Sequence, residues 1–117
     1  MGLGRIFAID FDGTLRKAPS SMFPYTDNKY ANLPLIEMLL DNKKNNPLDQ
    51  YILWTCRQSR EEIKLAVDFC KQYGLRFDAV NENVYRSYGY TRKIIADIYI
   101  DDRAVNVNNL DEIRAVL

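Results

Sequence analysis

The most informative stretch of this chain reads Ile6-Phe7-Ala8-Ile9-Asp10-Phe11-Asp12-Gly13-Thr14-Leu15. It opens with an uninterrupted apolar run, which is typical of a strand buried on both faces of a parallel sheet. The run stops at two carboxylates, Asp10 and Asp12. Ligands of such sheets bind outside the carboxyl ends of the strands. We therefore predict a central strand that delivers two aspartates to a functional edge.

The two aspartates could meet one cation in either of two ways. Side chains at i and i+2 of an extended chain point the same way, so both carboxylates converge if the strand continues through Phe11. If the chain curls there, one side chain and one backbone carbonyl serve instead. Gly13 permits the turn that follows, because it has no Cβ to exclude positive φ. A solvated turn is the alternative interpretation, since Asp is common where strands end.

The composition is that of an ordinary soluble domain: 117 residues, 47% of them apolar and 27% charged. Sixteen basic residues balance sixteen acidic ones, so bulk charge gives no signal for nucleic acid or a membrane surface. No apolar run approaches the ~20 residues of a membrane span. The two cysteines lack a metal-binding spacing and are interpreted as reduced thiols. We expect one cytoplasmic domain over residues 1–117.

The chain contains no histidine. This excludes mechanisms in which His is the base, the nucleophile or a metal ligand. Neither the Gly-rich dinucleotide fingerprint nor the P-loop pattern occurs, so those two modes of nucleotide binding are excluded as well.

Strand and helix patterns alternate along the rest of the chain, which predicts an α/β fold with a mostly parallel central sheet. Ser59 and Glu62 match a capping box at the start of the second helix, and Gly74 is expected to end that helix. The expected elements are a helix from Leu33-Pro34 to about 42–47, strands at 50–55, 77–81 and 96–100, helices at 59–73 and 109–117, and a short helical segment holding Arg92 and Lys93.

Three of the predicted strands end on polar groups, which we expect to meet at one edge of the sheet. The expected set is Asp10, Asp12, Thr55, Lys93, Asp101 and Asp102. Four carboxylates at one edge repel one another unless a cation lies among them. Ligands that are all oxygen favour Mg²⁺, bound together with a substrate phosphate. A hydroxyl and an ammonium group at the same edge suit that phosphate, and Arg57 and Arg103 are further candidate contacts or else solvated salt bridges.

These residues, in this order, resemble the four signature motifs of the haloacid dehalogenase-like superfamily. The motifs are Asp10 to Leu15, Thr55 after an apolar strand, Lys93, and Asp101-Asp102 after another apolar strand. The segments 52–57 and 92–103 resemble a group of small bacterial and phage members. The resemblance implies a three-layer Rossmann-like sandwich with no cap domain, because neither of the usual insertion points has room for one.

The resemblance also implies a Mg²⁺-dependent phosphomonoester hydrolase. Asp10 would be the nucleophile that forms an aspartyl phosphate, and Asp12 would act as general acid and then general base. Thr55 and Lys93 would hold the transferring phosphoryl group. The metal ligands would be Asp10, Asp12 (through its carbonyl), Asp102 and, in support, Asp101. Gly13 and Arg57 are further candidate phosphate contacts.

The substrate implied is a phosphorylated small molecule or a phosphorylated macromolecule. Without a cap, water must be kept out by the segments 16–32 and 82–90 or by a second copy of the chain in a homo-oligomer. Two structural alternatives remain: Lys93 as a surface lysine with Arg92 in its place, and Thr55 as the cap of the following helix.

Several other functions compete with the hydrolase. A signalling receiver domain has similar residues, but it places its lysine last, whereas Asp101-Asp102 follow Lys93 here. A two-metal nuclease would have no need for Thr55 and Lys93. A catalytically weak module that binds a nucleotide or a protein partner, and a phosphotransferase to an acceptor other than water, stay open.

Overall fold

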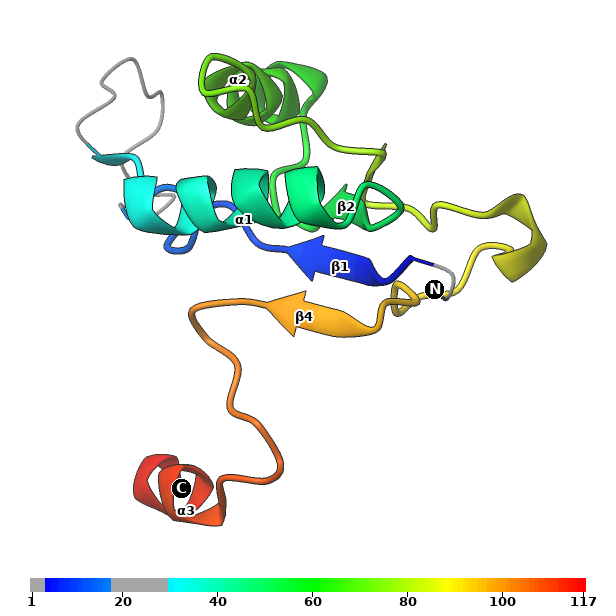
Figure 1. The fold of residues 1–117 in the computed structure, drawn as a ribbon. Helices are drawn as coiled ribbons and strands as arrows, with labels where there is room; N and C mark the ends of the chain where they lie inside the picture. Colours follow the sequence, from blue (N-terminus) through cyan, green and yellow to red (C-terminus); the bar gives the residue numbers. More distant parts are fainter. Residues whose placement is uncertain (1–3, 18–29) are drawn as a thin grey trace.

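The computed structural model describes residues 4–17 and 30–117, and its centre is a sheet of four strands in the order β3-β2-β1-β4 (Figure 1). All neighbouring strands pair in parallel. The predicted α/β fold with a parallel central sheet is therefore confirmed, and no separate cap domain is present in the part of the chain described. The strands are β1 (Ile6–Ile9), β2 (Gln50–Leu53), β3 (Ala79–Val80) and β4 (Ile98–Ile100).

Strand β1 lies between β2 and β4 and is buried along its whole length. Phe7 and Ile9 belong to the larger apolar cluster, whereas Ile6 and Ala8 belong to a smaller cluster. Successive side chains of a strand point to opposite faces of the sheet, so the two clusters cover the two faces. This is why the sequence of β1 is continuously apolar rather than alternating.

Helices α1 (Leu33–Asn45) and α2 (Arg60–Lys71) pack on the face that carries Phe7 and Ile9. Phe69 of α2 contacts Phe11 with the two rings edge to face, 5.4 Å between centroids. Both helices follow the predicted pattern. The side chain of Ser59 caps α2 by accepting a hydrogen bond from the backbone N–H of Glu62 (3.0 Å), and Gly74 follows with a φ of 85°.

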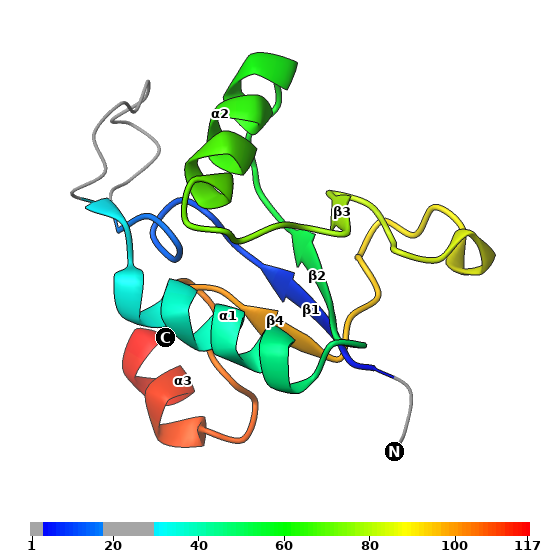
Figure 2. The same ribbon diagram turned by 45° about the horizontal axis from the view of Figure 1, so that its top comes forward.

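The second face of the sheet is covered differently. In the described residues its cluster is completed by Val84, Ile94 and Ala96, which lie on irregular chain between β3 and β4. Figures 1 and 2 show this segment, in yellow, projecting away from the helices. On this face of the sheet, the third layer of the predicted three-layer sandwich is therefore formed by irregular chain.

The last helix, α3 (Leu110–Val116), lies beyond β4 and buries none of its residues (Figure 1). The predicted helical segment at Arg92 and Lys93 is wrong: the helical turn comes earlier, as a 3-10 turn at Arg86–Tyr88. Among the helices of residues 4–17 and 30–117, none has the length and apolar character needed to cross a membrane.

Candidate metal and phosphate site

Backbone pairing carries the sheet one residue beyond the ends of its strands. The N–H of Asp10 donates to the carbonyl of Ile100 (2.9 Å), and the N–H of Trp54 donates to the carbonyl of Ile9 (2.9 Å). The residues that follow β1, β2 and β4 are thereby held at the same height along the strand direction. Asp10, Thr55 and Asp101 meet at this edge for that reason, as the sequence predicted.

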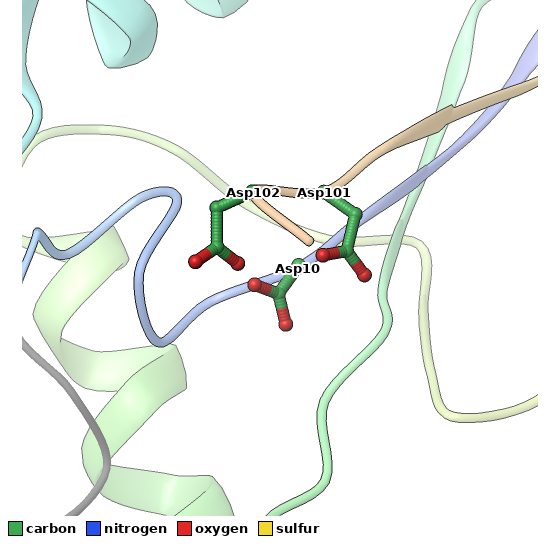
Figure 3. Close-up of side chains that lie close together, drawn as sticks. All are labelled: Asp10, Asp101 and Asp102. Carbon is green, nitrogen blue, oxygen red and sulfur yellow. The ribbon is translucent and has the colours of Figure 1, made fainter. Parts of the chain in front are cut away.

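Three carboxylates converge at the edge: Asp10 from the end of β1, and Asp101 and Asp102 from the segment after β4 (Figure 3). One oxygen of each lies within 4.8 Å of one oxygen of each of the others. We call these three residues the acidic cluster. All of its donors are oxygens, which is the ligand chemistry that Mg²⁺ takes in proteins.

The acidic cluster changes the acidity of Asp10. Burial raises the pKa of this carboxyl from 3.8 to about 7, and the nearby charges of Asp101 and Asp102 add to the rise. The hydrogen bond from Thr14 acts in the opposite direction. The structure thus places the charged form of Asp10 where a cation would stabilise it.

Thr14 links two members of the acidic cluster. Its hydroxyl donates to Oδ2 of Asp10 (2.9 Å) and accepts from the backbone N–H of Asp102 (3.0 Å). The side chain is buried, and both bonds are partly shielded from water. Thr14 is part of the first motif, but no role for its hydroxyl group is predicted from the sequence.

Gly13 lies directly against the acidic cluster. Its φ is 90°, and a Cβ at this position would come within 2.4 Å of Oδ2 of Asp102. A glycine is therefore required here both for the backbone conformation and for the space that the Asp102 carboxylate occupies.

Asp12 is not a member of the acidic cluster. The chain curls after Phe11, since the N–H groups of Thr14 and Arg16 both donate to the Phe11 carbonyl (3.1 Å each). The Asp12 carboxylate accepts two hydrogen bonds from Arg57, at 2.9 Å from Nε and 3.0 Å from Nη2. Of the two predicted arrangements the structure has the curled one, in which the Asp12 side chain is bound to Arg57.

The site opens into a cavity of about 720 Å³, which we call the edge cavity. Most predicted site residues border it, and so do Lys17 and Cys56, for which no role in the site is predicted from the sequence. The alternative that Thr55 caps α2 is wrong, because Ser59 does so; the Thr55 hydroxyl accepts from the N–H of Arg57 (3.2 Å). The lining residues are Asp10, Asp12, Gly13, Lys17, Thr55, Cys56, Arg57, Gln58, Glu62, Asp101, Asp102 and Arg103.

Lys93 is the predicted site residue that the structure does not bring to the edge cavity. Its Nζ lies 5.1 Å from the ring centroid of Tyr99. The chain just before β4 lies at the amino end of β1, where the N–H of Asp97 donates to the carbonyl of Ile6 (2.8 Å). The expected position of Lys93 fails because no helix carries the chain back toward the carboxyl edge before β4 begins.

Of the two segments expected to cover the site, only 82–90 lies wholly within the described residues. Figure 1 shows the yellow segment that includes 82–90 projecting beyond the amino end of β1, and none of these residues lines the edge cavity. It is therefore not a cover for the edge cavity in this structure. Most of the other segment, 16–32, lies outside the described residues.

The raised pKa of Asp10 predicts how stability depends on pH. The unfolded chain loses this proton near pH 3.8 and the folded chain near pH 7, so ionisation of Asp10 lowers stability progressively between about pH 4 and 7. Asp10→Asn should remove that fall and raise the Tm at pH 8, with little effect at pH 4. Thermal unfolding in EDTA measures this. Asp12→Asn is the control, and it should lower the Tm at both pH values because it leaves Arg57 buried without this carboxylate.

Gly13→Ala should be more damaging than Gly74→Ala. Both residues have positive φ, which disfavours alanine by about 1–2 kcal/mol, but a Cβ at Gly74 meets only Cδ2 of Leu40, at 4.0 Å. Only the change at Gly13 pushes against Asp102, so only this variant should also weaken Mg²⁺ binding. Urea unfolding and titration calorimetry measure the two effects, and equal behaviour of the two variants would contradict the steric account.

Comparison with known proteins gives one likeness. No family model matches this chain, and no curated protein matches it. A solved structure of a conserved protein from Bacteroides thetaiotaomicron is similar, with a TM-score of 0.63 and 28% sequence identity. The match covers 97% of this chain and 91% of that one. The likeness supports the fold over nearly the whole chain, and the function is argued from the site.

Proposed function

We propose that this protein is a Mg²⁺-dependent phosphomonoester hydrolase that works through an aspartyl phosphate on Asp10. The observation that carries the proposal is the acidic cluster. It places a half-buried carboxylate, oriented by Thr14, beside two further carboxylates at an open cavity. A carboxylate next to a cation site is suited to attack a phosphoryl group whose charge the cation offsets.

The residues at the edge fit a magnesium ion. Asp10, Asp101 and Asp102 would hold it, with the backbone carbonyl of Asp12 as a further ligand, and Gly13 leaves the space that the Asp102 carboxylate needs. When bound, Mg²⁺ would neutralise the acidic cluster and polarise the phosphoryl oxygens. Water and the substrate phosphate would complete its coordination.

The proposed reaction has two steps. A carboxylate oxygen of Asp10 attacks phosphorus as the bond from phosphorus to the leaving oxygen breaks, and Asp12 gives a proton to that oxygen. A water molecule then attacks the phosphorus of the aspartyl phosphate and gives its proton to Asp12. Inorganic phosphate leaves, and Asp10 is restored as a carboxylate.

The charge of the transferring group would be offset by polar and basic side chains that line the edge cavity. Thr55 supplies a hydroxyl, and Lys17 and Arg103 supply positive charge. In this proposal Lys17 takes the place that the family resemblance gives to Lys93. The open cavity of about 720 Å³ suits a phosphate carried by a sizeable molecule, whether a small-molecule ester or an exposed group on a macromolecule.

A second candidate is a catalytically weak module that binds phosphorylated ligands. Two observations favour it: Lys93 lies away from the edge cavity, and Asp12 is bound by Arg57. Binding of Mg²⁺ and phosphate without turnover would support this candidate over the hydrolase.

The hydrolase proposal predicts Mg²⁺-dependent release of inorganic phosphate. We expect turnover of one or more members of a panel containing p-nitrophenyl phosphate, nucleotides, sugar phosphates and oligonucleotides phosphorylated at the 5′ or 3′ end. Asp10→Asn should lower kcat by at least about 10³-fold, because it removes the nucleophile. The matched control is Asp41→Asn, an exposed aspartate on α1. Turnover that survives in EDTA, or in Asp10→Asn, would contradict the mechanism.

The two candidate lysines can be separated by one pair of variants. If Lys17 binds the phosphoryl group, Lys17→Met should lower kcat/KM by about 10-fold or more, whereas Lys93→Met should leave it nearly unchanged. Steady-state kinetics on the best substrate of the panel measure both variants. The opposite ranking would mean that Lys93 reaches the substrate, as the family resemblance implies.

A further inference from the structure

Arg57 is a buried cation inside the edge of the site. Its side chain is only 3% exposed, and its guanidinium donates three hydrogen bonds to two partners. Nε and Nη2 donate to the two oxygens of Asp12, and Nη1 donates to the backbone carbonyl of Glu62 (2.8 Å). The guanidinium carbon also lies 4.7 Å from the ring centroid of Phe11.

These contacts fix Asp12 relative to two other parts of the fold. The carbonyl of Glu62 belongs to the first turn of α2, and the backbone N–H of Arg57 donates to the hydroxyl of Thr55 at the end of β2. A bidentate pair fixes the plane of a carboxylate as well as its position. The orientation of Asp12 is therefore set by the β2–α2 connection and not by its own turn alone.

The same contacts argue against the prediction that Arg57 binds the substrate phosphate. A phosphate-binding arginine turns its donors toward the cavity, whereas three of the five N–H donors of Arg57 are directed at Asp12 and Glu62 and its side chain is only 3% exposed. Lys17 and Arg103 line the edge cavity and are exposed, so positive charge for the substrate has another source.

We propose that Arg57 is a positioning residue, which orients the carboxylate of Asp12 for proton transfer and does not bind the substrate phosphate. This inference rests on the proposed function, in which Asp12 moves the proton. Loss of Arg57 should therefore lower kcat, through its effect on Asp12, and leave the affinity for phosphate unchanged. Lysine cannot replace it fully, because an ammonium group lacks the planar fork.

A kinetic double-mutant cycle tests the proposal, with Asp12→Asn, Arg57→Gln and the combined variant assayed on p-nitrophenyl phosphate with Mg²⁺. Arg57→Gln should lower kcat by about 10²-fold, the effect of a misplaced catalytic group, with KM within about 2-fold of wild type. The combined variant should be no slower than Asp12→Asn alone, since residues that act as a unit are not additive. Arg60→Gln, at an exposed position on α2, is the matched control.

The opposite kinetic pattern would overturn the proposal. If Arg57 binds phosphate, Arg57→Gln should raise both KM and the inhibition constant of inorganic phosphate by about 10-fold or more, and its effect should add to that of Asp12→Asn. Arg57→Lys serves if Arg57→Gln does not fold. A lower kcat with unchanged KM in this variant supports positioning, and a raised KM or unchanged kinetics contradicts it.

A measurement that needs no turnover separates this inference from the proposed function. The Nε–H of Arg57 should give a slowly exchanging NMR signal in the wild-type protein, and Asp12→Asn should remove its protection. An active wild type in which this proton exchanges freely would overturn the positioning role alone. An inactive wild type that keeps the protected proton would overturn the hydrolase, and with it the catalytic role of Arg57, while leaving the ion pair established.

Discussion

Parallel pairing of β1 with β2 and with β4 aligns the carboxyl ends of these three strands, so the residues that follow them lie side by side. The bonds from Asp10 to Ile100 and from Trp54 to Ile9 extend the two ladders past the last strand residues. Asp10 and Asp101 are then neighbours because of main-chain geometry, and their carboxylates stay close despite their repulsion. The rest of the site is built on this alignment: Thr14 bonds across it, and Gly13 leaves room for Asp102.

The site divides its four carboxylates into two groups with different surroundings. Among the described residues no basic side chain forms an ion pair with Asp10, Asp101 or Asp102, whereas Asp12 is paired with the buried Arg57. A gathered group of like charges favours an external cation. A carboxylate held by a buried arginine is instead fixed in place. The structure thereby gives different surroundings to two aspartates that stand only two positions apart in the sequence.

The sequence predicted well what depends on local patterns. The apolar run of β1 marked a central strand, and Ser59, Glu62 and Gly74 marked the ends of α2, because periodicity and capping act within a few residues. It predicted the site residues at strand ends for the same reason. It could not place Lys93, Lys17 or the partner of Asp12, since each of these positions depends on the path of irregular chain, which no short-range signal sets.

Phe11 connects the chemistry of this edge to the mechanical properties of the core. It lies between Asp10 and Asp12 in the chain, is fully buried, and packs against Phe69 of α2 while Arg57 lies over its ring. Protein interiors are packed as densely as organic crystals and resist deformation. The two aspartates on either side of Phe11 therefore share the stiffness of that packing, so preorganisation at this edge comes from the hydrophobic interior as much as from the polar contacts around it.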